Sequence, residues 1–366
     1  MRIAFDHQIF GWQEYGGISR YFCELARALA CDLGEEVEVV APWYINRYLP
    51  EIAADVAVAG RRVPRLPLGG RFYRRINDVL AAAPLRRFRP DIVHETYYAA
   101  ARHAPKSAKI VLTVLDMVHE RHPEGFARLD PLYREKALAV ARADHVLCIS
   151  ECTRRDLLEL LDVDPAKTSV VHLGFTRLPA PDPAPAGSGR PFLLFVGKRV
   201  PYKNFSGLLA AYAASPALRQ DFDLLCFGGA PLDAAERRTI QQLGLRQDAV
   251  RHTAGSDAML AACYRAAHAL VYPSLYEGFG IPPLEAMSMD CPVACSNASS
   301  LPEVVGDAAA LFDPQDTDAV RGAIERVASD DDWRRELVAR GRRRLALFSW
   351  RRCAEQTQAL YRKLLA

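Results

Sequence analysis

The chain has 366 residues, of which half are hydrophobic and a quarter charged, and its formal net charge is +3. The length exceeds the ~250–300 residues that one hydrophobic core supports, so we expect two domains. The nine cysteines are scattered without a C-x-x-C pair, which argues against a zinc or disulfide framework and for a reducing compartment. No run approaches the ~20 apolar residues that span a bilayer, and no apolar leader precedes the first strand, so we expect a soluble protein.

The chain opens with a strand, loop, helix and strand. Residues Arg2–Phe5 predict the strand, and the loop from Asp6 to Tyr15 leads to Gly16 and Gly17. Apolar residues then recur at helical spacing before a second strand at Val37–Val40. In this βαβ pattern the glycines lie at a helix N-terminus, where the backbone can approach an anion. Most such glycine pairs are simple turns, so the pair alone is weak evidence.

An arginine-rich stretch follows. Residues 61 to 89 hold nine arginines against one acid, Asp78. Apolar residues are spaced to face one side of a helix in this stretch: Phe72, Ile76, Val79 and Leu80. Such a helix could lie on an anionic membrane leaflet. It could equally be a solvated face, or a basic rim that steers a phosphorylated substrate. Nucleic-acid binding is not expected, because no known nucleic-acid-binding module accompanies the arginines.

Further apolar runs predict strands at 91–94, 110–115 and 146–149, and His94 is a candidate lining residue at the end of its strand. Residues 178–191 (LPAPDPAPAGSGRP) form a proline-rich stretch without periodicity, which is typical of a linker. We therefore expect a first domain at 1–178, a linker at 179–191 and a second domain at 192–349. The final helix, 350–366, should cross back to pack on the first domain.

The second domain restarts with a strand at Phe192–Val196, followed by Gly197, Arg199, Lys203 and Asn204 just before a helix. Two cations after a glycine at a strand end suit a diphosphate, because Arg offers a fork of donors and Lys a point charge. The plainer interpretation is two exposed cations in a loop.

The most informative stretch is 271–287 (VYPSLYEGFGIPPLEAM). A buried strand ends before a glycine loop that carries Glu277, and Glu285 is expected in the first turn of the next helix. Ligands of open α/β sheets bind at this edge, and ionised carboxylates accept hydrogen bonds from paired hydroxyls. The loop amides of Phe279 and Gly280 would suit a phosphate or a second sugar face. The plainer alternative makes Glu285 a helix N-terminal acid and Glu277 a solvated loop residue.

This stretch resembles the carboxyl-terminal signature of retaining glycosyltransferases of the GT-B fold, in particular glycosyltransferase family 4 (glycosyl transferases group 1). That family has two glutamates separated by seven residues, with E-G-F-G around the first. The resemblance implies an α/β fold of two Rossmann-like parallel-sheet domains that face a central cleft. The opening F-D-H-Q-I-F…Y-G-G-I-S-R-Y-F is similar to mannosyltransferase-like members that act in bacterial surface-polysaccharide assembly.

The resemblance also implies roles at the donor site. Glu285 would bind the donor ribose, and Glu277 would hold the donor sugar with the amides of the residues that follow it. Arg199 and Lys203 would hold the leaving diphosphate. The remaining donor-binding positions are glycines, an asparagine and a phenylalanine: Gly16, Gly17, Gly197, Asn204, Gly278, Phe279 and Gly280.

On the acceptor side the chain departs from the family pattern. Many members have a histidine directly before the aspartate of the segment 115–123, and this chain has Leu115. Asp116 and His119 remain candidates there, although Asp116 could merely cap the following segment. The D-x-D triplet at 162–164 matches the metal signature of a different glycosyltransferase fold, but Pro165 follows it, so a surface turn explains it better.

We therefore expect a metal-independent hexosyltransferase without a cofactor. It would move a sugar with retention from a nucleotide-diphosphate sugar, GDP-mannose or a related donor being favoured. The acceptor would be saccharide or lipid-linked, in polysaccharide or O-antigen synthesis. The expected location is the cytoplasm, with peripheral contact at the inner membrane face. Alternatives are a GT-B epimerase or phosphorylase, or a non-catalytic sugar-nucleotide-binding protein.

Overall fold

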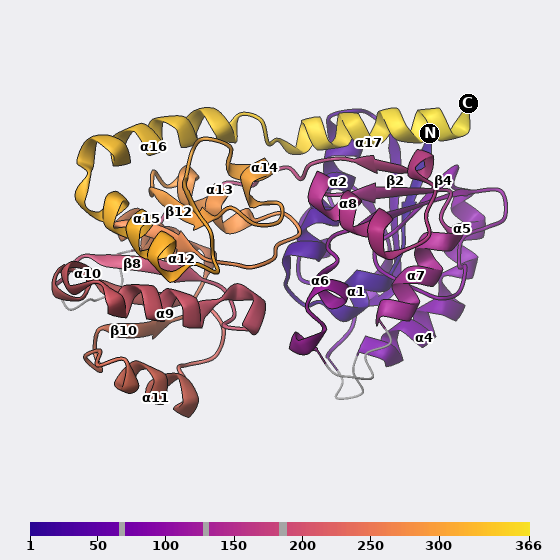
Figure 1. The fold of residues 1–366 in the computed structure, drawn as a ribbon. Helices are drawn as coiled ribbons and strands as arrows, with labels where there is room; N and C mark the ends of the chain where they lie inside the picture. The colour runs from indigo at the N-terminus through magenta and orange to yellow at the C-terminus, as the bar shows by residue number, and fades with distance from the viewer. Residues whose placement is uncertain (66–69, 127–131, 183–188) are drawn as a thin grey trace. The chain divides into compact units, whose positions relative to one another are not determined.

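A computed structural model describes residues 1–65, 70–126, 132–182 and 189–366 (Figure 1). The chain divides into two compact units. The first comprises Met1–Arg121, Phe126–Gly174 and Phe348–Ala366, and the second His122–Gly125 and Phe175–Leu347. The unit boundary therefore falls a few residues before the predicted linker at 179–191, of which residues 183–188 lie outside the described part.

The first unit is built on a parallel sheet of seven strands in the order β3-β2-β1-β4-β5-β6-β7. The order reverses between β1 and β4, so the crevice at their carboxyl ends is a natural ligand site. The strands are β1 Arg2–Phe5, β2 Glu36–Tyr44, β3 Ala57–Arg62, β4 Ile92–Glu95, β5 Lys109–Val114, β6 His145–Cys148 and β7 Thr168–Val170.

Helices connect these strands, as parallel pairing requires. They are α1 Gln8–Trp12, α2 Gly17–Cys31, α3 Leu49–Ile52, α4 Gly70–Leu80, α5 Ala82–Phe88, α6 Val118–Arg121, α7 Leu132–Arg142 and α8 Glu151–Leu160, with a short η2 at Pro165–Lys167.

The second unit has a parallel sheet of six strands in the order β10-β9-β8-β11-β12-β13. The strands are β8 Phe192–Val196, β9 Asp223–Phe227, β10 Val250–Thr253, β11 Ala269–Tyr272, β12 Val293–Ser296 and β13 Ala310–Phe312. These strands are nearly continuous apolar runs in the sequence, because helices cover and bury both faces of a parallel sheet. The prediction of two Rossmann-like parallel-sheet domains is confirmed.

The helices of the second unit follow its strands in alternation. They are α9 Phe205–Ala214, α10 Pro216–Asp221, α11 Ala234–Gln242, α12 Asp257–Ala266, α13 Ile281–Ser288, α14 Leu301–Val305, α15 Thr317–Ser329 and α16 Asp331–Leu345, with short η1 Pro123–Gly125 and η3 Pro201–Lys203. Several begin with a side-chain cap: Asp233, for example, forms a capping box with Glu236 at the start of α11.

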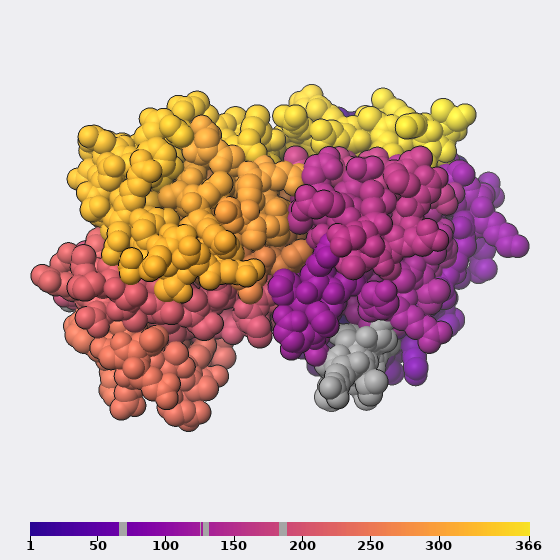
Figure 2. All heavy atoms as spheres, viewed as in Figure 1, coloured from indigo at the N-terminus to yellow at the C-terminus, as the bar shows by residue number. Residues whose placement is uncertain are grey.

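The final helix, α17 Trp350–Leu365, belongs to the first unit and packs on α2. The space-filling view shows it lying over that unit (Figure 2). Its buried Tyr361 places its hydroxyl 2.5 Å from Nδ1 of His94 on β4, and Nε2 of His94 lies 2.7 Å from Thr113 Oγ1. His94 is therefore a buried structural residue, and the expectation that it lines a site is wrong.

One local expectation was also wrong. The predicted loop from Asp6 to Tyr15 contains α1, whose Gln8, Ile9 and Phe10 are buried.

In α4 the buried residues are Tyr73 and Asn77, and the Asn77 side chain forms hydrogen bonds with both backbone groups of Trp43. The predicted apolar face is therefore not the core face of α4. Its Phe72 and Ile76 are half-buried, and Val79 and Leu80 are exposed.

No helix in the described residues is long and apolar enough to cross a membrane. Each of the nine cysteines is a free thiol, and all but Cys31 are buried.

Candidate functional site

The loop between β8 and α9 carries the predicted cations at the carboxyl end of the sheet. Gly197 has φ of 132°, which a side chain would strain, and Lys203 closes η3. Asn204 adopts a left-handed conformation and caps α9, its Oδ1 accepting from the Gly207 amide at 3.2 Å. Its Nδ2 donates to the carbonyl of Pro314 at 2.8 Å, so the side chain fixes the loop.

Lys203 and Glu277 meet although 74 residues separate them. Lys203 Nζ lies 2.6 Å from Glu277 Oε1 and 2.9 Å from the hydroxyl of Tyr272, the last residue of β11. The two side chains are 15% and 12% exposed. Strands β8 and β11 are neighbours, which is why these two loops converge. Burial, followed by the charge of Glu277, raises the pKa of Tyr272 well above its usual range, so the phenol stays protonated.

Glu285 lies in the second turn of α13, one turn later than predicted. Its Oε2 accepts a hydrogen bond from the buried Tyr264 hydroxyl at 3.0 Å. The charge of Glu285 also contributes to the raised pKa of Tyr272. Glu285 therefore lies near Tyr272, whose hydroxyl contacts Lys203, while hydrogen bonds join Lys203 to Glu277 and Glu285 to Tyr264.

Two serines that were not predicted as site residues hold the glycine loop in place through hydrogen bonds to its backbone. Ser300 Oγ donates to the carbonyls of Glu277 at 2.9 Å and Phe279 at 2.8 Å, and the Glu277 amide donates to Ser299 Oγ at 2.9 Å. Gly280 has φ of 105°, and a Cβ there would lie 2.6 Å from Leu301. Gly278 lies between these fixed points. The loop is thus rigid before any ligand binds.

Arg199 belongs to the same β8–α9 loop but engages other partners. Its Nε donates to Glu236 Oε1 at 2.6 Å, and its guanidinium also contacts the carbonyls of Gly228 (3.4 Å) and Ala230. Only 5% of the side chain is exposed. Arg199 is therefore held by α11 and the β9–α11 loop, and its polar partners in the described part of the chain lie there rather than at Glu277 or Glu285.

In the first unit, Gly16 and Gly17 open α2 as predicted. A Cβ at Gly16 would lie 2.3 Å from Gln13 Oε1, which accepts a hydrogen bond from the Ser19 amide at 3.3 Å. A Cβ at Gly17 would meet nothing within 4 Å. Packing against Gln13 therefore requires a glycine at position 16, whereas the space beside Gly17 is open.

Asp116 and His119 have structural contacts. Asp116 Oδ1 accepts from the Val118 amide at 3.1 Å, as the capping alternative predicted, and its carbonyl accepts from the buried Lys136 at 3.0 Å. The His119 ring stacks on Phe126 with centroids 3.7 Å apart. Lys136, which the sequence did not reveal, also pairs with Glu120 at 2.8 Å.

Across the described ranges no group of three or more His, Cys, Asp or Glu residues is arranged to hold a metal ion. The D-x-D triplet forms a turn, in which Asp164 Oδ1 accepts from the Ala166 amide at 2.9 Å.

Residues 15–176 match the family profile "Glycosyltransferase Family 4", and residues 180–344 match "Glycosyl transferases group 1". The O-antigen chain mannosyltransferase B of Escherichia coli is 30% identical over 377 residues, which cover 95% of this chain and 96% of the relative. The MMP alpha-(1->4)-mannosyltransferase of Mycolicibacterium hassiacum is 35% identical over 228 residues, covering 60% of this chain and 54% of the relative. The solved sucrose-phosphate synthase of Thermosynechococcus elongatus matches with a TM-score of 0.76 and 25% identity, over 100% of this chain and 99% of that one.

The fold and these matches define a glycosyltransferase of the GT-B class. More closely, the chain belongs to glycosyltransferase family 4.

Proposed function

We propose that the chain transfers mannose, with retention of anomeric configuration, from GDP-mannose to a saccharide or lipid-linked acceptor. The product would be part of a bacterial surface polysaccharide such as O-antigen. The names of two relatives support this choice, since one that spans nearly the whole chain is an O-antigen mannosyltransferase and another is also a mannosyltransferase. The reaction uses no metal.

The observation that carries the donor assignment is the convergence of Lys203, Glu277 and Glu285 around Tyr272. A nucleotide sugar needs a cation at its diphosphate and acceptors at its hydroxyls. Lys203 supplies the cation, and the two carboxylates supply the acceptors. Glu285 binds the ribose hydroxyls, and Glu277 binds the hydroxyls of the donor sugar.

The transfer step needs charge stabilisation more than a strong base. The bond between the anomeric carbon and the diphosphate oxygen breaks, and negative charge develops on the diphosphate. A preorganised donor facing such a charge typically contributes ~3–4 kcal/mol. Lys203 stabilises this charge. Arg199 does so as well once its guanidinium leaves Glu236 and binds the diphosphate. The acceptor oxygen forms the new bond on the same face, and its proton passes to the departing diphosphate.

The roles of Asp116, His119, Gly16 and Gly17 remain predictions within this proposal. Asp116 and His119 lie after β5 on the acceptor side, and both already have structural contacts. The open space at Gly17 is where a phosphate could approach the start of α2.

A donor panel tests the proposal. The protein is incubated with GDP-mannose, UDP-glucose, UDP-galactose, UDP-N-acetylglucosamine or dTDP-rhamnose and a set of octyl glycosides, and products are read by mass spectrometry. We expect one hexose to be added from GDP-mannose. Glu277→Gln should lower the rate by about 10²-fold or more. The exposed Glu355→Gln on α17, whose partner is Arg351, is the matched control. Transfer from another donor alone would overturn the mannose assignment.

Peripheral membrane contact is a second part of the proposal, and α4 and α5 carry it. Val79 and Leu80 are exposed, and so are Arg75, Arg86, Arg87 and Arg89. Exposed apolar residues beside cations suit the surface of an anionic leaflet, where each cation contributes about 1 kcal/mol. Arg74 is occupied by a paired contact with Glu135 at 2.7 Å. The side chain of Arg71 lies outside the described part.

Vesicle sedimentation tests this contact. The triple variant Arg75→Gln, Arg86→Gln, Arg87→Gln should weaken binding to vesicles with phosphatidylglycerol by about 10²-fold. A triple variant on α16, Arg335→Gln, Arg342→Gln, Arg343→Gln, removes the same charge from another exposed surface. Equal losses in both variants would show general charge attraction and remove the assignment to α4 and α5.

A further inference from the structure

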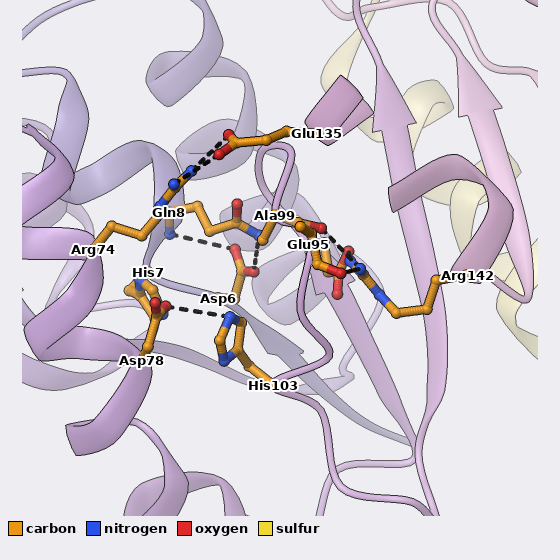
Figure 3. A network of polar contacts seen from close by, with 11 residues as sticks. Asp6, His7, Gln8, Arg74, Asp78, Glu95, Ala99, His103, Glu135 and Arg142 are labelled. Carbon is orange, nitrogen blue, oxygen red and sulfur yellow. Dashed lines mark hydrogen bonds and ion pairs between the residues drawn. The ribbon is translucent and has the colours of Figure 1, made fainter. Parts of the chain in front are cut away.

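The carboxyl ends of β1 and β4 carry a cluster of buried and half-buried polar side chains that includes none of the site residues assigned above. Asp6, His7 and Gln8 follow β1, Asp78 lies on α4, and His103 lies in the loop after β4. Strands β1 and β4 are parallel neighbours, so these side chains meet at one edge of the first unit's sheet. Figure 3 shows them pointing toward one another. We call these five residues the His7 cluster.

Asp6 fixes the geometry of this cluster. Its Oδ1 accepts from the amide of Thr96 at 2.8 Å and from the Thr96 hydroxyl at 2.6 Å. Its Oδ2 accepts from Gln8 Nε2 at 2.7 Å. The amide group of Gln8 is thereby oriented, and its Oε1 is turned away from Asp6. That oxygen is buried and has no hydrogen-bond partner among the described residues.

His7 is a buried member of the cluster whose polar contacts are incomplete. The residue is 1% exposed, and its Nδ1 has no hydrogen-bond partner within the described part of the chain. Its Nε2 lies 3.4 Å from Asp78 Oδ1, and His103 Nε2 lies 3.2 Å from the same oxygen. Asp78 is thus a partner for Nε2, whereas Nδ1 has none in the described residues, and a buried nitrogen without a partner costs about 1–3 kcal/mol.

The unmet groups identify the partner's chemistry. Gln8 Oε1 accepts hydrogen bonds, whereas Nδ1 of an imidazole can donate or accept. An anion would be repelled by Asp6 and Asp78, and the acids and histidines among the described residues are not arranged to hold a metal ion. The flanking cations Arg74 and Arg142 are already paired with Glu135 and Glu95 at 2.7 and 2.6 Å (Figure 3). Neutral hydroxyls, which donate and accept at one atom, fit all these groups.

An apolar face lies beside the cluster. Trp12, at the end of α1, is 50% exposed and stacks on Tyr97 with ring centroids 6.5 Å apart. Tyr97 directly follows Thr96, whose hydroxyl binds Asp6 and accepts from the Ile9 amide at 3.2 Å. Ligand can reach the cluster, because the Asp78 side chain is 28% and the His103 side chain 17% exposed. Sugar rings combine hydroxyls with an apolar C–H face, and an amphipathic aromatic suits both.

We propose that the His7 cluster binds the hydroxyls of the acceptor sugar, with Trp12 and Tyr97 as the apolar face on which its ring lies. This inference rests on the proposed glycosyl transfer and adds to it the residues that select the acceptor. His7 and Gln8 are the main contacts. Asp78 orients both imidazoles and contacts the sugar directly.

The test separates acceptor binding from donor chemistry. The variants are His7→Phe, Gln8→Met and the partly exposed Asp78→Asn, each close in volume to the native residue. The matched control is His145→Phe on β6, whose Nε2 binds Ser169 Oγ at 2.8 Å. His145 is the first residue of β6, so it lies at the amino ends of the strands, whereas the His7 cluster lies at their carboxyl ends. For each protein we measure hydrolysis of GDP-mannose without acceptor, and transfer to the octyl glycoside that the panel above identifies.

We expect His7→Phe and Gln8→Met to raise the acceptor KM about 10-fold or more, while donor hydrolysis changes less than about twofold. A monodeoxy series of the same glycoside sharpens the result. One deoxy acceptor should be poor with the native protein and no poorer with Gln8→Met, because the lost hydroxyl and the lost amide are partners.

Unchanged acceptor KM in folded variants would overturn the inference, because the cluster would then hold only buried water. Parallel loss of hydrolysis and transfer would also overturn it. If the variants at the buried His7 and Gln8 fail to fold, the partly exposed Asp78→Asn still tests the acceptor KM. A native protein that hydrolyses and transfers nothing would instead count against the proposed function, so the two failures are distinguishable.

Discussion

Lys203 Nζ lies 2.6 Å from Glu277 Oε1 in a pair that is mostly buried. A buried pair stabilises little overall, yet removal of one partner is strongly destabilising. The cation assigned to the diphosphate is therefore held in place by the acid assigned to the donor sugar, and each depends on the other.

Lys203→Met should have two separable effects. It leaves Glu277 without its cation, so the free energy of unfolding should fall by roughly 3 kcal/mol. It should also weaken binding of a nucleoside diphosphate by about 10–100-fold while binding of the nucleoside stays unchanged. Calorimetry and thermal melts give both quantities. The double variant Lys203→Met, Glu277→Gln should recover stability but not affinity; recovery of affinity would refute the diphosphate role.

Glu285 should recognise the ribose. In Glu285→Gln, GDP affinity should fall about tenfold, whereas 2′,3′-dideoxy-GDP should bind as it does to the native protein. Tyr264→Phe removes only the hydroxyl that donates to Glu285 at 3.0 Å and should have a smaller effect. If Glu285→Gln weakens both ligands equally, the carboxylate does not contact the ribose hydroxyls.

The fold and the meeting of Lys203 with Glu277 could be predicted because they follow from local pattern. Apolar runs that alternate with helical spacing predict parallel sheets, and Lys203 and Glu277 lie in the loops that follow two predicted strands. Nothing in the sequence pairs Arg199 with Glu236, which lies 37 residues further on in a helix cap. Periodicity fixes which α4 residues share a face but not which face is buried. Asn77 decides that by binding Trp43, where β2 shifts its register against β3.

The His7 cluster could not be predicted for a similar reason. Its members come from β1, α4 and the loop after β4, and no spacing in the sequence joins Asp78 to His7 or His103. Only the strand order, with β1 beside β4, brings them to one edge.

The His94–Tyr361 contact should stabilise the first unit and make it acid-sensitive. Burial lowers the pKa of His94 to about 3, so the folded ring stays neutral. Below pH ~6.5 the imidazole of His94 becomes protonated in the unfolded chain but stays neutral in the folded chain. Stability is therefore fully present above that pH and falls, by at most about 1.4 kcal/mol per pH unit, as pH drops toward 3.

Tyr361→Phe tests this contact directly. It leaves His94 Nδ1 buried without its 2.5 Å partner and should lower stability by about 1–3 kcal/mol. The measurement is the melting temperature from pH 7.5 to 5, with the exposed Tyr133→Phe as control. An unchanged melting temperature in Tyr361→Phe would mean that the hydroxyl contributes nothing.

Metal removal should leave the reaction intact. In the proposed mechanism Lys203 and Arg199 supply the positive charge, so GDP-mannose hydrolysis in EDTA should stay within about twofold of the untreated rate. Loss of hydrolysis that added Mg²⁺ or Mn²⁺ restores would contradict the metal-free account.

The most direct measurement follows the anomeric proton of the product by NMR while the protein consumes GDP-mannose in the presence of an octyl glycoside. We predict an α-mannosyl product, with the configuration of the donor retained, formed by the native protein and lost in Glu277→Gln. A β-linked product, or equal turnover by Glu277→Gln, would contradict the account.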